Sequence, residues 1–518
     1  MLPLLLVTLA APLAAQRSPA PVATLPRDLD RFVEQTMQEF GVPGLALAIV
    51  KDGKVVLARG YGVRTLGTTD KVDARTQFGI ASNTKVFTAV ALGMLVEQGK
   101  LAWDKPVIDY LPWFAMYDPY VTRELTIRDL LVHRSGFGLG AGDLLWWPAS
   151  TYDRKEIARR LRYIKPATSF RSAYAYDNVL YTVAGEVIET ITGRTWEDFV
   201  QSEILAKVGM THSSVRHSDA GEGGNVATTH AKVEGTLKTV APMVSDNTNP
   251  AGGINSGADD MAKWLLVMAD SGKLADGSSL YSPRTARQLW SIVTPLGTGA
   301  APAWIAPLSR NFNGYGLGLG LHDYRGVKVA THTGGLPGYV SKVTTVPSAR
   351  LGVAVLTNAE SGEAFEAITW RIVDHYLGAK PFDWIGGFKR QRAIADSTVA
   401  AQRQAAATSR DATSRPSLPL AKYAGTYRDA WYGDVEIADE GGKLAIRFKH
   451  TPGLVGDLEH WQYDTFLARW RDREMRADAY VTFQLGPDGK VDQVKMVPES
   501  SEVDFSFDFQ DLLLEPVK

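Results

Sequence analysis

The sequence contains no cysteine. This absence excludes disulfide bonds, thiolate zinc sites, iron–sulfur clusters and cysteine nucleophiles together. The sequence also has no large excess of positive or negative charge: it contains 56 Lys and Arg residues and 57 Asp and Glu residues, which gives a formal net charge of −1. Such a balance provides no global attraction to nucleic acid or to an anionic membrane. No stretch after the N-terminus reaches the roughly 18 apolar residues of a spanning helix.

The rest of the composition is that of a globular protein. The chain has 518 residues, of which 45% are hydrophobic and 22% charged, which excludes a collagen, a coiled coil and a wholly disordered chain. At about 150 residues per unit, this length allows three or four folding units.

The N-terminus predicts an export signal over residues 1–15. An apolar run from Leu2 ends in small residues near Ala15 and is followed by the polar Gln16-Arg17-Ser18. The run is too short to span a membrane, and its shape is typical of a secretory signal, although no Lys or Arg precedes it. An ordinary apolar tail is the alternative. We expect an exported soluble protein, periplasmic or secreted, with a flexible Pro/Ala-rich leader over 16–26.

Residues 27–390 predict an α+β domain. Helical spacing over 28–40 is followed by two apolar runs around the turn 51–54, which indicates an antiparallel hairpin. Helices are expected at 84–98, 127–132, 154–163 and 179–192. Beyond 314 the pattern returns to strands, with alternation over 314–320, a hairpin over 343–358 and a helix over 363–377. We therefore expect an antiparallel sheet built from both ends of the domain, flanked by helices and interrupted by an all-helical insertion.

The remaining chain differs in composition. Residues 391–417 have few bulky apolar side chains and predict a partly helical linker. Residues 418–518 combine short aromatic segments with turn signals and predict a small all-β domain, a barrel or a sandwich. Its aromatic residues suit a core better than a ligand-binding lining; they are Tyr423, Tyr427, Trp431, Tyr432, Trp461 and Phe466.

The first candidate catalytic motif is Ser82-Asn83-Thr84-Lys85. The nine histidines form no metal-binding motif, and no G-x-S-x-G elbow is present. Ser82 is expected near a helix N-terminus, where backbone N–H groups favour developing negative charge, with Lys85 one turn later. A desolvated lysine loses its proton and activates a neighbouring hydroxyl. Taken alone, the motif fits a capping serine followed by a solvent-facing lysine somewhat better than a catalytic pair.

Two further elements follow. Tyr176 and Asn178 precede an amphipathic helix, where a tyrosine that is partly phenolate beside a lysine moves protons and an amide bonds a substrate. His332-Thr333-Gly334-Gly335 ends a predicted strand, and its glycines allow close backbone approach. The N–H of Gly335 is then a candidate partner for that of Ser82 in an oxyanion hole. Alone, each element fits ordinary packing or a turn.

In this order and placement the three elements resemble the serine β-lactamase and penicillin-binding family, and within it the class C β-lactamase, D-aminopeptidase and esterase group. The resemblance covers roughly 27–385 and implies the corresponding fold, followed by an appended β domain. It implies Ser82 as acylated nucleophile, Lys85 as base, Tyr176 as proton carrier and Asn178 as substrate ligand. No metal or other cofactor is implied.

His332 occupies the position that is lysine in typical β-lactamases, which disfavours β-lactamase activity because a histidine is mostly neutral at pH 7. Trp146 and Trp147 are candidate floor residues for a bulky substrate group, or ordinary packing. We therefore expect cleavage of small peptides or amides, including D-residue-containing, unusual or linearised cyclic peptides. The alternatives are a carboxylesterase, a β-lactamase or a sensor that is acylated without turnover. The oligomeric state stays open.

Overall fold

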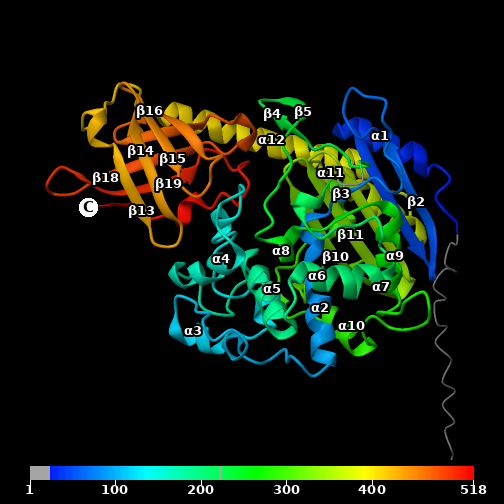
Figure 1. Ribbon diagram of the computed structural model, residues 1–518. Helices are drawn as coiled ribbons and strands as arrows, with labels where there is room; N and C mark the ends of the chain where they lie inside the picture. The colour runs from blue at the N-terminus through cyan, green and yellow to red at the C-terminus, as the bar shows by residue number, and fades with distance from the viewer. Residues whose placement is uncertain (1–23, 221–223, 518) are drawn as a thin grey trace, which may run out of the picture.

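The computed structural model describes residues 24–220 and 224–517. The predicted signal peptide at 1–15 lies outside these residues, as does most of the predicted leader at 16–26. Figure 1 shows a larger domain built around a sheet and a smaller barrel beside it, with a long helix running between the two.

The larger domain is built on an eight-stranded antiparallel sheet with strands from both ends of the domain, as predicted. Its order is β2-β1-β12-β11-β10-β9-β8-β7. The strands are β1 (Gly44–Lys51), β2 (Lys54–Gly62), β7 (Thr294–Pro295), β8 (Asn313–Tyr315), β9 (Gly320–Tyr324), β10 (Val327–Leu336), β11 (Tyr339–Val346) and β12 (Leu351–Thr357). Two short pairs lie outside it: β3 (Phe78–Gly79) with β6 (Asn255–Ser256), and β4 (His230–Val233) with β5 (Thr236–Thr239).

Both faces of this sheet are covered, and strand β1 shows why. All eight of its residues are buried, and successive side chains of a strand point to opposite faces. Leu45, Leu47 and Ile49 belong to the core cluster formed with two helices, α1 (Leu29–Phe40) and α11 (Gly362–Tyr376). The alternate residues Ala46 and Ala48 belong to the cluster that includes α2 (Lys85–Glu97) and the helical insertion. The catalytic candidates lie on this second side.

The helices follow the predicted pattern with one exception. They are α1 (Leu29–Phe40), α2 (Lys85–Glu97), α3 (Pro119–Glu124), α4 (Arg154–Arg160), α5 (Val179–Thr192), α6 (Trp196–Val200), α7 (Ala206–Val208), α8 (Asn249–Gly252), α9 (Ala258–Ala269), α10 (Pro283–Leu289), α11 (Gly362–Tyr376) and α12 (Trp384–Ser409). The helix predicted at 127–132 is wrong, because only a 3₁₀ turn forms at Asp129–Leu131. Thr126 and Asp129 exchange hydrogen bonds that cap the start of this turn, but the chain leaves the helical conformation at His133, which has φ +54°.

The glycine-rich stretch 314–320 is not one strand, as its alternation predicted. The chain leaves β8 at Tyr315 and re-enters the sheet as β9 at Gly320, so the stretch is a hairpin. Gly318 has φ +76°, and a Cβ there would lie 3.0 Å from the carbonyl oxygen of Lys85. The glycine is therefore required both by its left-handed backbone and by the close approach to the start of α2.

Helix α12 connects the two domains. It is 26 residues long and runs through most of the predicted linker, as far as Ser409. Only Trp384, Gly387 and Phe388, at its beginning, are buried, which agrees with the small, polar composition of the rest. Within the described residues, no helix has both the length and the apolar character needed to cross a membrane.

The C-terminal domain is a nearly closed antiparallel barrel in the order β19-β18-β17-β16-β15-β14-β13-β20. A bridge between Val494 in β19 and Leu514, just before β20, brings the two ends together. Of the six aromatic residues weighed from the sequence, all but Trp461 are buried core. The strands are β13 (Gly425–Asp429), β14 (Gly433–Asp439), β15 (Leu444–Phe448), β16 (Val455–Gln462), β17 (Thr465–Trp470), β18 (Ala479–Leu485), β19 (Val491–Pro498) and β20 (Glu515–Pro516).

Candidate active site

Ser82 lies in a 3₁₀ turn, Ala81–Thr84, that leads directly into α2. The preceding Ala81 has φ +51°, a left-handed conformation that alanine rarely adopts and that surrounding contacts must hold. Ser341 on β11 provides such contacts, since its hydroxyl donates to the carbonyl of Ile80 at 2.8 Å and accepts from the Asn83 amide at 2.7 Å. Ser82 is partly exposed, whereas its neighbours in the turn are buried.

Lys85 is the first residue of α2 and is fully buried. Its Nζ lies 3.1 Å from Ser82 Oγ, 2.7 Å from Asn178 Oδ1 and 3.0 Å from the carbonyl oxygen of Ala251. Burial lowers the pKa of Lys85 to about 7, while the nearby Asp143 and Asp177 oppose this shift. Near neutral pH a large share of Lys85 is therefore an uncharged amine.

The three partners of Lys85 differ in what they offer an uncharged amine. The oxygens of Asn178 and Ala251 accept hydrogen bonds, so they take the two amine hydrogens. Ser82 alone carries a hydroxyl proton, and the remaining lone pair of Nζ is available to accept it. The arrangement thus directs the basic electron pair of Lys85 toward the Ser82 hydroxyl.

Tyr176 lies in the loop before α5 and shares a hydrogen bond with Ser82. Lys85 Nζ is 4.9 Å from the centroid of its ring. Burial raises the pKa of Tyr176 well above 10, which favours a neutral hydroxyl over the partial phenolate considered from the sequence. A neutral hydroxyl beside Ser82 both donates and accepts hydrogen bonds, which is what passing a proton through this position requires.

His332 lies on β10 and is held at both ring nitrogens. Nδ1 is 2.5 Å from the carbonyl oxygen of Thr333, which accepts its proton, and Nε2 accepts from the Tyr315 hydroxyl at 2.7 Å. Burial and the proximity of Lys85 lower the pKa of His332 to about 3. The imidazole is therefore neutral, and it supplies no fixed positive charge where typical β-lactamases have lysine.

Gly334 and Gly335 have different surroundings at the end of β10. A Cβ on Gly334 would lie 2.2 Å from the carbonyl oxygen of Ile80, so β10 packs directly on the turn that carries Ser82. Gly335 is exposed and has nothing within 4 Å of such a Cβ. Gly335 thus borders open space one residue beyond the contact with the Ser82 turn.

Asn178 is fully engaged by the protein. Its Oδ1 accepts from Lys85, and its Nδ2 donates to Asp143 Oδ2 at 2.8 Å. In the structure this amide orients Lys85, and its predicted contact with substrate stays a prediction. Trp146 has the same partner, since its Nε1 donates to Asp143 Oδ1 at 2.8 Å.

Several residues at this site were not selected from the sequence. Asp143 and Asp177 are fully buried, and burial raises the pKa of each to about 7. His133 has φ +54° and its ring centroid lies 4.3 Å from that of Tyr176. Tyr315 bonds His332. The sequence signals available were an aspartate among apolar residues in 142–147 and the position of Asp177 between two chosen residues.

Gly335 is one of the residues that line a cavity of about 420 Å³. Trp147 and Phe507 contribute to its mostly apolar lining, together with Leu336 and Met475. Trp146 does not line it but packs edge-on against Trp147, with 5.3 Å between ring centroids. Because Met475 and Phe507 belong to the C-terminal domain, both domains form the wall of this cavity.

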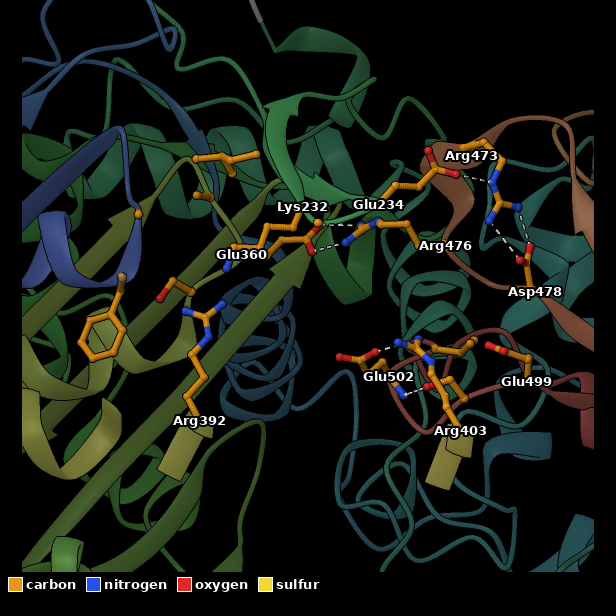
Figure 2. A pocket seen from close by; sticks show the side chains of 18 of the residues that line it. Lys232, Glu234, Glu360, Arg392, Arg403, Arg473, Arg476, Asp478, Glu499 and Glu502 are labelled. Carbon is orange, nitrogen blue, oxygen red and sulfur yellow. Dashed lines mark hydrogen bonds and ion pairs between the residues drawn. The ribbon is translucent and has the colours of Figure 1, made fainter. Parts of the chain in front are cut away.

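A second, larger cavity of about 660 Å³ is lined mainly by charged residues (Figure 2). Its arginines are already paired with acids: Arg473 bonds Glu234 at 3.2 Å and Asp478 at 2.7 Å, and Arg476 bonds Glu360 at 2.7 Å. Two of these pairs join the barrel to the larger domain. Arg476 and Glu360 also line the first cavity, so this ion pair separates the two spaces.

One group among the described residues has the spacing of metal ligands, formed by His212, Asp259 and Asp260. Asp260 already accepts from the Ser213 hydroxyl at 2.9 Å and from Lys263 at 2.7 Å. These bonds account for it as a local structural cluster. It includes none of the residues around Ser82.

Comparison with known proteins gives two family matches. Residues 29–377 match the family described as Beta-lactamase, and residues 409–516 match a domain of unknown function, DUF3471. The Unguisins hydrolase ungD' of Aspergillus campestris (strain IBT 28561) is 30% identical over 501 residues, which cover 92% of this chain and 90% of that protein.

Solved structures share the fold. The octameric penicillin-binding protein homologue from Pyrococcus abyssi gives a TM-score of 0.59 at 22% identity, covering 94% of this chain and 99% of that one. A D-stereospecific amidohydrolase from Streptomyces sp. gives 0.51 at 20% identity, covering 67% of this chain and 98% of that one. The predicted α+β fold with a C-terminal barrel is confirmed.

Proposed function

The chain belongs to the Beta-lactamase family, and on that premise we propose that it is an exported serine hydrolase that cleaves peptide and amide bonds of small peptides through an acyl-enzyme on Ser82. The observation that carries this proposal is the environment of Lys85. Its Nζ is buried, lies 3.1 Å from Ser82 Oγ, and has two acceptor oxygens as its other partners.

The reaction has two halves. In acylation, Lys85 takes the Ser82 proton while Oγ attacks the substrate carbonyl carbon, and the N–H groups of Ser82 and Gly335 receive the developing oxyanion. As the carbon–nitrogen bond breaks, the leaving amine gains a proton through Tyr176. In deacylation, water attacks the ester and gives up a proton to the same groups, which releases the acid and restores the Ser82 hydroxyl.

The names of similar proteins support amide chemistry over ester chemistry. One similar protein is named an unguisins hydrolase, and one similar structure is a D-stereospecific amidohydrolase. The largely apolar cavity beside Gly335, with Trp147 in its wall, suits a bulky apolar side chain. The neutral His332 disfavours substrates whose binding needs a fixed positive charge, such as the carboxylate of a β-lactam.

The test is a kcat/KM panel on the chain from Gln16 onward. The panel holds D- and L-aminoacyl amides, small linear peptides, a short acyl ester and a chromogenic cephalosporin. We expect the peptides or amides to lead, and Ser82→Ala to abolish their cleavage. An exposed serine variant, Ser501→Ala, is the matched control and should retain full activity. Cleavage unchanged in Ser82→Ala would overturn the mechanism, and an ester in the lead would overturn the substrate class.

A further inference from the structure

A segment of the C-terminal domain reaches the active site. This return segment, residues 504–509, follows β19 and lies against the loop 140–147 of the larger domain. Asp508 accepts from the backbone N–H groups of Gly142 at 2.7 Å and Leu144 at 3.1 Å. The Ser506 hydroxyl donates to Asp143 Oδ2 at 2.8 Å. Both side chains are buried, with Ser506 4% exposed and Asp508 fully covered.

These contacts continue to the catalytic lysine. Asp143 Oδ2 accepts from Ser506 and also from Asn178 Nδ2, at 2.8 Å each. Asn178 Oδ1 then accepts from Lys85 Nζ at 2.7 Å. A continuous series of buried hydrogen bonds therefore links the C-terminal domain to the amine beside Ser82.

The direction of the Asn178 amide depends on this series. An asparagine presents a donor at one end and an acceptor at the other. With Nδ2 held by Asp143, Oδ1 must face Lys85. If Asp143 were neutral or displaced, the amide would be free to turn Nδ2 toward Lys85, and the acceptor that orients the amine would be lost. The Ser506 hydroxyl opposes this outcome, because hydrogen bonds to a carboxylate favour its charged form.

We infer that Ser506 and Asp508 are positioning residues for the Lys85 base, so that the C-terminal domain is a working part of the active site. This inference rests on the proposed function, in which Lys85 is the base. Neither residue contacts Ser82; both act through Asp143 and the loop that carries it. Other titratable groups packed around Lys85 and Asp143 are Asp177, His133, Tyr176, Tyr181 and His332.

Two neighbours in the same segment agree with this role. Phe505 packs edge-on against Tyr176, with 5.9 Å between ring centroids. Phe507 lines the same cavity as Gly335. A Cβ on Gly140 would lie 2.6 Å from the carbonyl oxygen of Phe505, so the loop 140–147 and the return segment are in tight backbone contact.

The experiment compares Ser506→Ala and Asp508→Asn with the exposed control Ser501→Ala. Ser501 precedes the same segment and donates only to Gln402 in α12. A small fluorophosphonate that labels nucleophilic serines measures both the fraction of competent sites and the rate constant of Ser82 labelling. The pH dependence of that rate constant and the melting temperature are recorded for each variant.

We expect every Ser82 site of the Ser506→Ala variant to be labelled, with a plateau rate constant about tenfold below that of the wild type. This ratio corresponds to an activation barrier about 1.4 kcal/mol higher. The acid limb of the profile of labelling rate constant against pH should move to lower pH. Without the Ser506 donor, Asp143 is charged less often and therefore stabilises the Lys85 ammonium less. Asp508→Asn should change the rate in the same direction. Ser501→Ala should match wild type throughout.

Other results would overturn the inference in distinct ways. A wild-type rate and acid limb in both variants would show that the return segment does not act on Lys85. A reduced fraction of competent sites, with the remaining sites labelled at the normal rate and midpoint, would reduce Ser506 to a structural role. Failure of Ser82 to be labelled in the wild-type chain would overturn the proposed function itself, and this inference with it.

Discussion

In the proposed mechanism only uncharged Lys85 accepts the Ser82 proton, so kcat/KM should rise with pH through about 7, the pKa to which burial lowers Lys85. About two units below this midpoint, roughly 1% of the lysine is uncharged, so kcat/KM near pH 5 should be about 100-fold below its plateau. Asp143 and Asp177 titrate in the same range, so the observed midpoint belongs to the three groups together.

The assay is kcat/KM for a substrate without titrating groups, measured over about pH 5–9 at constant ionic strength. The melting temperature is followed in parallel to separate chemistry from unfolding. A profile that stays flat over this range, or one that is still rising steadily at pH 9 as for an ordinary lysine, would refute the assignment of Lys85 as the base.

The Lys85→Arg variant tests whether residue 85 must lose a proton for catalysis or need only carry a positive charge. Arginine keeps the charge and the donors but does not lose its proton in this range, so activity should fall at least about 100-fold at every pH. Lys342 in β11 is another buried lysine; it pairs with Glu366 in α11, on the face of the sheet opposite Ser341. Lys342→Arg is the matched control, and its pH profile should keep the wild-type midpoint.

Three further predictions concern residues of the candidate site and of the cavity beside it. Gly334→Ala should destabilise the protein by about 3 kcal/mol, because its Cβ would lie 2.2 Å from the carbonyl of Ile80; Gly335→Ala, which meets nothing within 4 Å, should stay within about 0.5 kcal/mol. Denaturant unfolding measures both, and equal effects would contradict this packing. Tyr176→Phe should lower kcat about 100-fold or more without shifting the melting temperature, since it removes only the hydroxyl that bonds Ser82. Trp147→Ala should raise KM for bulky apolar substrates about tenfold and leave kcat nearly unchanged; a loss confined to kcat would remove Trp147 from the binding site.

Local patterns predicted the fold well where one element carries its own signal. The hairpin of β1 and β2 has a turn at 51–54 flanked by apolar alternation, and the structure pairs those strands. The pattern failed at 127–132, where capping bonds between Thr126 and Asp129 begin a 3₁₀ turn that the left-handed backbone of His133 then ends. At 314–320 a single left-handed glycine, Gly318, converted an expected strand into a hairpin.

The candidate site likewise contains contacts that local spacing predicts and contacts that it does not. Ser82 and Lys85 are three residues apart, so their spacing alone predicts a contact across one turn. The contact of Ser506 with Asp143 joins residues 363 positions apart, and no periodicity or motif in either segment indicates the partner. Buried carboxylates such as Asp143 are hard to predict because their placement depends on donors from elsewhere in the fold, here Asn178 and Ser506.

The electrostatics of the site favour the uncharged form of Lys85. His133 and His332 are both neutral, because burial and the lysine itself lower their pKa values; each is therefore a dipole and not a competing cation. Asp143 and Asp177 would stabilise the ammonium if both were fully charged, but burial raises the pKa of each to about 7. A change that exposes Asp143 to water would return its pKa toward the ordinary range, strengthen the ammonium of Lys85 and move the acid limb to higher pH. The return segment prevents such exposure, because Ser506 and Asp508 cover the loop on which Asp143 lies.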